Sequence, residues 1–190
     1  MDNDYITNLK YGQHKETVII NILNIAYGIS SIQDNTENVH DLKLNSGCLV
    51  EVKCDSNIKA TSNFWLELFG NFTKQKLGWF FYTDCNILAY CAVKNRSPYE
   101  LEKVFFIDFH GLYNFVKEKY YSGNFTNEID ICANIVYKGN EMALLIPISE
   151  VKPFIVSEFT KYDGVETFCN PKYKSMQEFS KKGYIDALVC

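Results

Sequence analysis

The sequence predicts a mixed α/β (α+β) domain in which helices flank a central mixed β-sheet. Apolar residues recur at helical spacing over 13–28 and 109–121. Short runs of alternating or continuously apolar residues, typical of strands, lie between and after these two segments. The order helix, strands, helix, strands indicates a sheet with helices packed on it. With 190 residues, of which 47% are hydrophobic, the chain is long enough for one domain with its own core.

The first predicted helix, 13–28, carries Glu16 in its first turn and ends at Gly28. Residues 29–40 are polar and predict a loop, with a short strand that ends near Asp41. The pair Ser46-Gly47 predicts a turn, and the alternation over 48–54 predicts a strand.

The later elements follow from the same patterns. Further strands are predicted at 63–69, 77–82, 86–93, 103–108, 131–137 and 142–147. A short helix is predicted at 149–156, and from 157 onward the pattern is mixed. We therefore divide the chain into a domain over 1–156 and a C-terminal extension over 157–190, packed on or beside that domain.

The composition limits the class of protein. A content of 22% charged residues is ordinary for a globular chain and excludes a disordered protein. The net charge of −4 argues against a protein that coats DNA without specificity, which would carry a basic excess. The seven cysteines form no C-x-x-C pair and predict reduced thiols in the cytoplasm. No apolar stretch approaches the length of a membrane span, so no membrane partner is expected.

The most informative pattern is Glu51-Val-Lys53 in a predicted strand, with Asp41 upstream. The two-residue period of a strand places Glu51 and Lys53 on one face, while Val50 and Val52 face the core. An exposed strand often carries such a pair as a surface ion pair, so the spacing alone is a weak signal.

Three features strengthen this signal. Asp41 precedes the strand at a distance that allows it to lie beside Glu51, where the two carboxylates can share a Mg²⁺ ion. The neighbouring predicted strands are strongly apolar, so the strand is central, and charges there require a polar site. Glu16 opens the first helix and can supply a third carboxylate. These groups suit metal-assisted hydrolysis of a phosphodiester.

The chain resembles the PD-(D/E)xK nuclease superfamily. Asp41 and Glu51-Val-Lys53 match its signature, with His40 where a proline often stands. The downstream order resembles a branch common in phages and mobile elements, and its matching segments are 61–67, Gly78-Trp79 and 83–90. The resemblance covers residues 13–150. Ser62 replaces the usual glycine, and residues 84–86 depart from the usual Ala-Asp.

The resemblance implies a restriction-endonuclease-like core and a Mg²⁺-dependent (or Mn²⁺-dependent) DNA endonuclease. Asp41 and Glu51 would be metal ligands, Lys53 would be the catalytic lysine, and Glu16 would be a further acidic ligand. The expected partner is DNA of undetermined form, and the oligomeric state is left open between a monomer and a homodimer, since many nucleases of this type cut as dimers. The expected location is the cytoplasm of a bacterium or a phage-infected host cell.

Other residues carry two interpretations each. Glu67 and Asp55 support the metal site or are ordinary strand residues, and His40 reaches the site or lies outside it. Trp79 is interpreted as a core residue. A further set of residues either contacts a DNA phosphate or consists of ordinary solvated loop and turn residues: Thr61, Asn63, Lys59, Lys74 and Lys76.

Two alternative functions stay open. The same fold can serve as a catalytically inactive module that binds nucleic acid or another protein. The chain can also be a small structural protein in which Glu51 and Lys53 form a surface ion pair.

Overall fold

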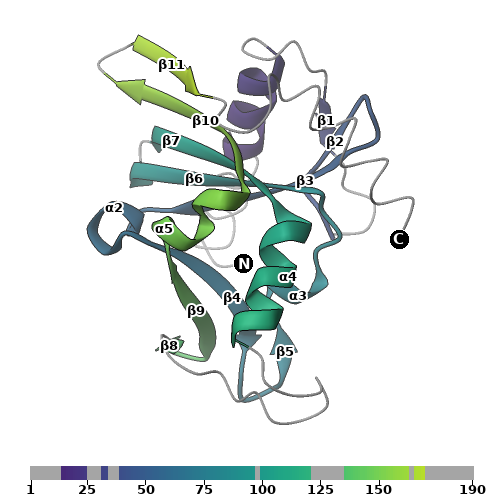
Figure 1. Cartoon of the computed structure of the whole chain (residues 1–190), viewed down its shortest axis with the longest axis vertical. Coiled ribbons are helices and arrows are strands. Elements are labelled where there is room, and N and C mark those ends of the chain that lie inside the picture. Colours follow the sequence, from purple (N-terminus) through teal and green to yellow (C-terminus); the bar gives the residue numbers. More distant parts are fainter. Residues whose placement is uncertain are drawn as a thin grey trace, which may run out of the picture.

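The computed structural model describes residues 14–24, 31–33, 39–96, 99–120, 135–162 and 165–169, and Figure 1 shows their arrangement. The described strands form two sheets. The first has seven strands in the order β1-β2-β3-β6-β7-β10-β11. Their bounds are β1 Ser31–Gln33, β2 Leu42–Leu44, β3 Leu49–Asp55, β6 Ile87–Arg96, β7 Tyr99–Asp108, β10 Ile155–Tyr162 and β11 Val165–Cys169.

The first sheet is mixed, as the sequence predicts. Strands β3 and β6 run parallel, whereas the other neighbouring strands of this sheet run antiparallel. A parallel pair needs a long crossover connection. The chain supplies one between β3 and β6, built from α2, β4, β5 and α3.

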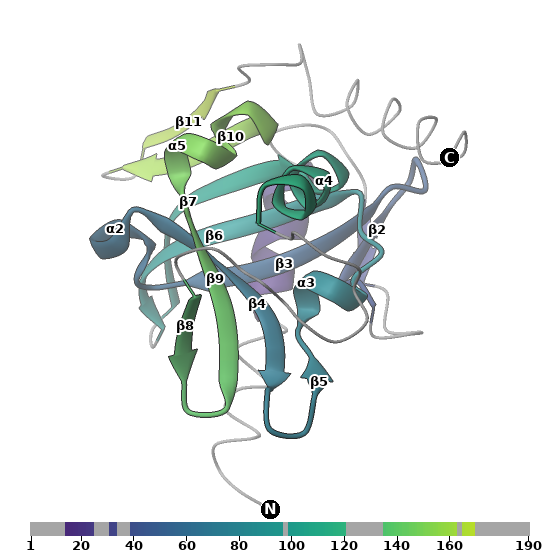
Figure 2. The same cartoon turned by 60° about the horizontal axis from the view of Figure 1, so that its bottom comes forward.

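The crossover contributes to a second sheet, which the sequence does not separate from the first. This four-stranded sheet has the order β5-β4-β9-β8 and extends from one side of the first sheet in Figure 2. The bounds of its strands and of the crossover helices are α2 Ile58–Thr61, β4 Asn63–Asn71, β5 Lys76–Leu77, α3 Trp79–Tyr82, β8 Ile135–Lys138 and β9 Glu141–Pro147.

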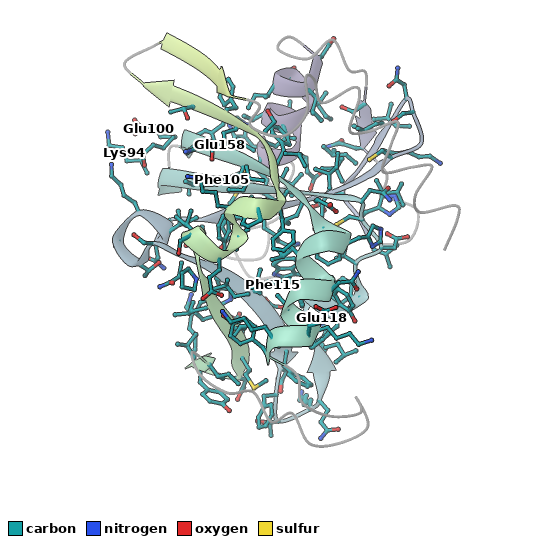
Figure 3. The ribbon with its side chains drawn as sticks, viewed as in Figure 1. Lys94, Glu100, Phe105, Phe115, Glu118 and Glu158 are labelled. Carbon is teal, nitrogen blue, oxygen red and sulfur yellow. The ribbon has the colours of Figure 1, made fainter. Side chains whose placement is uncertain are left out.

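Helices lie on both faces of the first sheet. One face is covered by a helix described over residues 14–24, which buries Ile19, Ile22 and Leu23 against the sheet. The other face carries α4 (Phe109–Tyr120), α5 (Ile148–Val151) and a 3₁₀ turn at Lys152–Phe154. Apolar side chains fill the space between this face, its helices and the second sheet. In Figure 3, Phe105 and Phe115 label this larger core on β7 and α4.

Alternation within β3 divides its side chains between the two cores. Val50 and Val52 are fully buried beside the helix at 14–24. Glu51, Lys53 and Asp55 point to the opposite face, because successive side chains of a strand alternate. The predicted strand at 48–54 is thus confirmed, and so are the two faces assigned to it.

Two element predictions are wrong. A short strand is predicted to end near Asp41, but β2 begins only at Leu42, and β1 lies inside the loop predicted at 29–40. Residues 77–82 were expected to form a strand, but Trp79–Tyr82 form the short helix α3, which begins after Gly78. A strand and a helix can each bury Trp79 and Phe80, so a short apolar run does not distinguish a strand from a helix. The predicted helix at 149–156 is also shorter, since β10 already begins at Ile155.

The division of the chain at residue 156 falls inside β10. This strand pairs with β7, and β11 pairs with β10, so residues up to Cys169 extend the main sheet. The rest of the predicted extension, from 170 onward, lies outside the described residues, as do residues 25–28 and 131–134 of two predicted elements. Within the described ranges, no helix has the length and apolar content needed to cross a membrane.

Candidate active site at the edge of strand β3

The candidate site lies where β3 continues beyond its partner β2. The two strands pair only at Leu42–Val50 and Lys43–Leu49. Continuing this register by one residue places Asp41 opposite Glu51. The Asp41 N–H donates to the Val50 carbonyl at 3.0 Å, and the Val52 N–H donates to Asp41 Oδ2 at 2.7 Å. The Asp41 carboxylate is therefore fixed against the backbone of β3, next to Glu51.

Glu51 and Lys53 contact each other on one face of β3. Glu51 is only 3% exposed, and its Oε1 forms an ion pair with Lys53 Nζ. The hydroxyl of Thr83 donates to Glu51 Oε2 at 3.5 Å. Lys53 Nζ also lies 5.4 Å from the ring centroid of Trp79, within the range of a cation–π contact. The pair is thus part of a buried polar site and is not a surface ion pair.

The charges of the site act on one another. Burial raises the pKa of Glu51, the Lys53 ammonium opposes that rise, and the Asp41 carboxylate adds to it, so that the pKa stays raised. Burial lowers the pKa of Lys53, but Glu51 and Asp41 outweigh burial and raise it. At neutral pH Lys53 is therefore an ammonium group. The raised pKa of Glu51 means that one lysine does not fully compensate this buried carboxyl group.

The helix at 14–24 adds one acidic and one basic residue to the same edge. Glu16 accepts a hydrogen bond from Gln33 Nε2 at 3.0 Å, and its pKa is raised by burial and by the charge of Asp41. Lys15 Nζ donates to the Val52 carbonyl at 3.0 Å. The sequence analysis missed Lys15. Its position beside Glu16 is a weak signal, because only the packing of the helix under β3 brings it to the site.

The donor set fits a hard divalent cation at a site of two carboxylates. Asp41 lies opposite Glu51 in the extended register and its charge raises the pKa of Glu51, while Glu16 is within electrostatic range of Asp41. Mg²⁺ is commonly held by one or two carboxylates, with water and substrate phosphate completing its shell. In the described part of the chain, no group of three or more His, Cys, Asp or Glu side chains is placed to hold a metal ion. A divalent ion here would therefore rest on Asp41 and Glu51, with Glu16 as a further acid near Asp41.

Several other predicted residues have structural partners. Asp55 accepts hydrogen bonds from Tyr90 Oη at 3.0 Å and from the Asn57 N–H at 2.7 Å. His40 Nδ1 lies 3.0 Å from Asp84 Oδ1, in the loop next to Thr83. The lysine Lys59 pairs with Glu102 at 2.7 Å.

Two further candidates bond each other within a turn. Asn63 Nδ2 donates to the Thr61 carbonyl at 2.7 Å, at the start of β4. Lys74 lies in the turn before β5, and Lys76 lies on β5. None of these contacts tests a role in phosphate binding.

A cavity of about 500 Å³ opens beside Lys53, between the end of β3 and the second sheet. Glu67 and Trp79 line it together with Lys53. Burial, and next the charge of Glu141, raise the pKa of Glu67. Gly78 permits this packing, because a Cβ atom there would lie 2.3 Å from the Glu67 carbonyl oxygen. Trp79 is only 5% exposed, so its interpretation as a core residue is confirmed, although it also faces Lys53.

Sequence reasoning missed Glu141 and Tyr82 in this cavity. Glu141 comes from β9, nearly half the chain away from β3, and no local pattern marks it. Tyr82 falls in a predicted strand, and only the helical turn of α3 directs it to the cavity.

Comparisons of the chain with protein-family models, curated proteins and solved structures give no significant match. The site therefore has to be interpreted from its own residues.

Proposed function

We propose that the protein is a metal-dependent DNA endonuclease that hydrolyses phosphodiester bonds at Asp41, Glu51 and Lys53. The observation that carries this proposal is the position of Glu51. Its carboxyl group is almost fully buried, in contact with an ammonium group and beside a second carboxylate. Folding alone gives no reason to place like charges together at a buried site. A reaction that requires a bound cation and a nearby amine would explain why these carboxylates lie together at a buried site.

The residues divide into two roles. Asp41 and Glu51 would hold Mg²⁺ or Mn²⁺, with Glu16 beside them. A bound divalent ion neutralises the charge of a phosphate and lowers the pKa of a water molecule. Lys53 supplies a positive charge next to the same carboxylates. Lys53, which Glu51 and Asp41 hold as an ammonium group, would donate to the phosphate and stabilise the charge that develops there.

The open edge of β3 supports access for a large substrate. Beyond Val50 the backbone of β3 bonds side chains in place of a neighbouring strand: the Val52 N–H donates to Asp41, and the Val52 carbonyl accepts from Lys15. No further strand of the described chain covers this position in the sheet order. A phosphodiester backbone can therefore approach the carboxylates from this side.

The test is cleavage by the full chain. Supercoiled plasmid, linear duplex and branched DNA are incubated with the protein in Mg²⁺, in Mn²⁺ and in EDTA. We expect nicked or linear plasmid in either metal and intact plasmid in EDTA. Intact DNA of all three forms in both metals would contradict the proposal and favour a binding module without catalysis. Degradation of linear DNA alone would assign an exonuclease.

A further inference from the structure

The cavity beside Lys53 differs in chemistry from a phosphate-binding cleft. Its volume of about 500 Å³ lies within the range of sites for small organic groups. Four aromatic side chains contribute to its lining: Trp65, Trp79, Tyr82 and Tyr90. Trp79 and Tyr90 are almost fully buried, so stacking on a planar group falls to Trp65 and Tyr82.

The cavity contains two carboxyl groups from neighbouring strands of the second sheet, Glu67 and Glu141. The carboxylate of Asp55 already accepts from Tyr90 and from the Asn57 N–H, and Lys53 is paired with Glu51. Glu67 and Glu141 lie close enough for the charge of one to raise the pKa of the other. These two carboxylates repel a phosphate. They favour a group that donates hydrogen bonds, such as the exocyclic amine of cytosine, adenine or guanine.

The cavity is continuous with the candidate active site through one side chain. Lys53 lines the cavity, contacts the carboxylate of Glu51 and lies over the ring of Trp79. A group held in the cavity is therefore adjacent to the amine assigned to the phosphate. In a nucleic acid, the group adjacent to a phosphate is a nucleoside, whose base is planar and carries the required donors.

We propose that this cavity binds an unpaired base of the DNA substrate, with bases that carry an exocyclic amine preferred over thymine. The inference rests on the proposed function and narrows its substrate to DNA that has an unpaired nucleotide next to the cleaved bond. A base inside a duplex cannot enter unless it leaves the stack, which costs free energy that a single strand or a mismatch does not require. Aromatic stacking and the carboxylates then hold the base.

The chain provides its own reporter for a binding test. It contains two tryptophans, Trp65 and Trp79, and both line the cavity. The wild-type protein in EDTA, where no cleavage is expected, is titrated with short single strands of deoxycytidylate, of thymidylate and of abasic residues, and with a blunt duplex. We expect the deoxycytidylate strand to quench tryptophan emission, with affinity about tenfold lower for the abasic strand and the duplex. Thymidylate, which lacks an exocyclic amine, should bind more weakly than deoxycytidylate.

A matched pair of tyrosine substitutions tests whether the base binds in this cavity. Tyr82 is 45% exposed and lines the cavity, whereas Tyr137 is 63% exposed and does not line it. Tyr82→Ala should lower the affinity for the deoxycytidylate strand about tenfold, and Tyr137→Ala should leave it unchanged. Because both side chains are exposed, neither substitution should unfold the protein, which circular dichroism checks.

The two proposals fail in different ways. Equal quenching by the abasic and deoxycytidylate strands, or equal loss in both tyrosine variants, would overturn the base site even if the protein cuts plasmid in Mg²⁺. Base-dependent quenching by a protein that cuts no DNA in either metal would support the base site and overturn the nuclease.

Discussion

Two lysine–glutamate pairs on the main sheet show how similar residues differ with position. Lys94 and Glu100 pair at 3.3 Å between β6 and β7, and their side chains are 63% and 49% exposed (Figure 3). Lys53 and Glu51 pair within β3, with side chains 24% and 4% exposed. Water surrounds the first pair, whereas a core, a second carboxylate and an aromatic ring surround the second.

The difference in burial indicates that the two ion pairs have different roles. An exposed pair contributes about 0–1 kcal/mol and gains little from precise placement. Removing two charges from water costs more than a single ion pair reliably returns. The buried pair is therefore a poor device for stability, and its position is best explained by chemistry.

Removing the buried amine should lower the cleavage rate by orders of magnitude. Lys53→Met, which keeps an unbranched apolar side chain, should lower the rate of plasmid cleavage in Mg²⁺ by about 10²–10⁴-fold, because the charge facing the phosphate is lost. Lys94→Met should cleave at the wild-type rate. A single-turnover cleavage assay measures both rates, and equal rates for the two variants would remove the distinction between the pairs.

Crowding around the buried pair should appear in the free energy of unfolding. Gly78→Ala places a Cβ atom 2.3 Å from the Glu67 carbonyl oxygen, so the backbone that carries Trp79 must shift. We expect a loss of about 1–3 kcal/mol in urea unfolding. Gly139→Asn is the control, because a Cβ atom at Gly139 meets nothing within 4 Å and asparagine tolerates the positive φ of 62°. A larger loss at Gly139 than at Gly78 would contradict this packing.

The burial of Glu51 predicts a pH dependence of stability. A carboxyl group whose folded pKa is raised destabilises the fold as pH increases, since the folded state then holds the proton more tightly than the unfolded state. In EDTA, the wild-type free energy of unfolding should fall between pH 4.5, the ordinary value for glutamate, and the raised pKa. The contribution of Glu51 to this slope is at most about 1.4 kcal/mol per pH unit.

Glu51→Gln isolates that contribution. The variant cannot ionise at position 51, so its unfolding free energy should fall less steeply than that of the wild type over the same pH range. Urea unfolding at a series of pH values measures both curves. Parallel curves would show that Glu51 is not perturbed in the folded protein.

The smallest effect belongs to the exposed pair. Lys94→Met removes a surface ion pair and should change the free energy of unfolding by about 0.2–1 kcal/mol, with the change reduced further in high salt. Thermal unfolding at low and high ionic strength measures it. A loss of several kcal/mol would mean that exposure is not what distinguishes the two pairs.

Local patterns predict the strand that carries the site but not its surroundings. The alternation of Val50, Glu51, Val52 and Lys53 is sufficient to identify β3 and its polar face. Spacing also identifies Asp41 as a neighbour, and the register of β2 places it there. These features depend on residues within one hairpin, where sequence distance limits spatial distance.

The remaining site residues arrive through tertiary contacts that no local pattern encodes. Lys15 reaches Val52 because the helix at 14–24 packs under β3, and Glu141 reaches Glu67 because β9 pairs with β4. The cavity between β3 and β4 depends on the second sheet, which the sequence does not separate from the first sheet. The run around Trp79 suits a strand or a helix equally, so the position of Tyr82 is not predictable from it.

The most direct test compares the two glutamates of these pairs. Glu51→Gln and Glu100→Gln each replace one carboxylate by an amide of similar size, and both variants are assayed beside the wild type on supercoiled plasmid in Mg²⁺. We predict no detectable cleavage by the folded Glu51→Gln protein and a wild-type rate for Glu100→Gln. Cleavage by Glu51→Gln at the wild-type rate would contradict the assignment of this site.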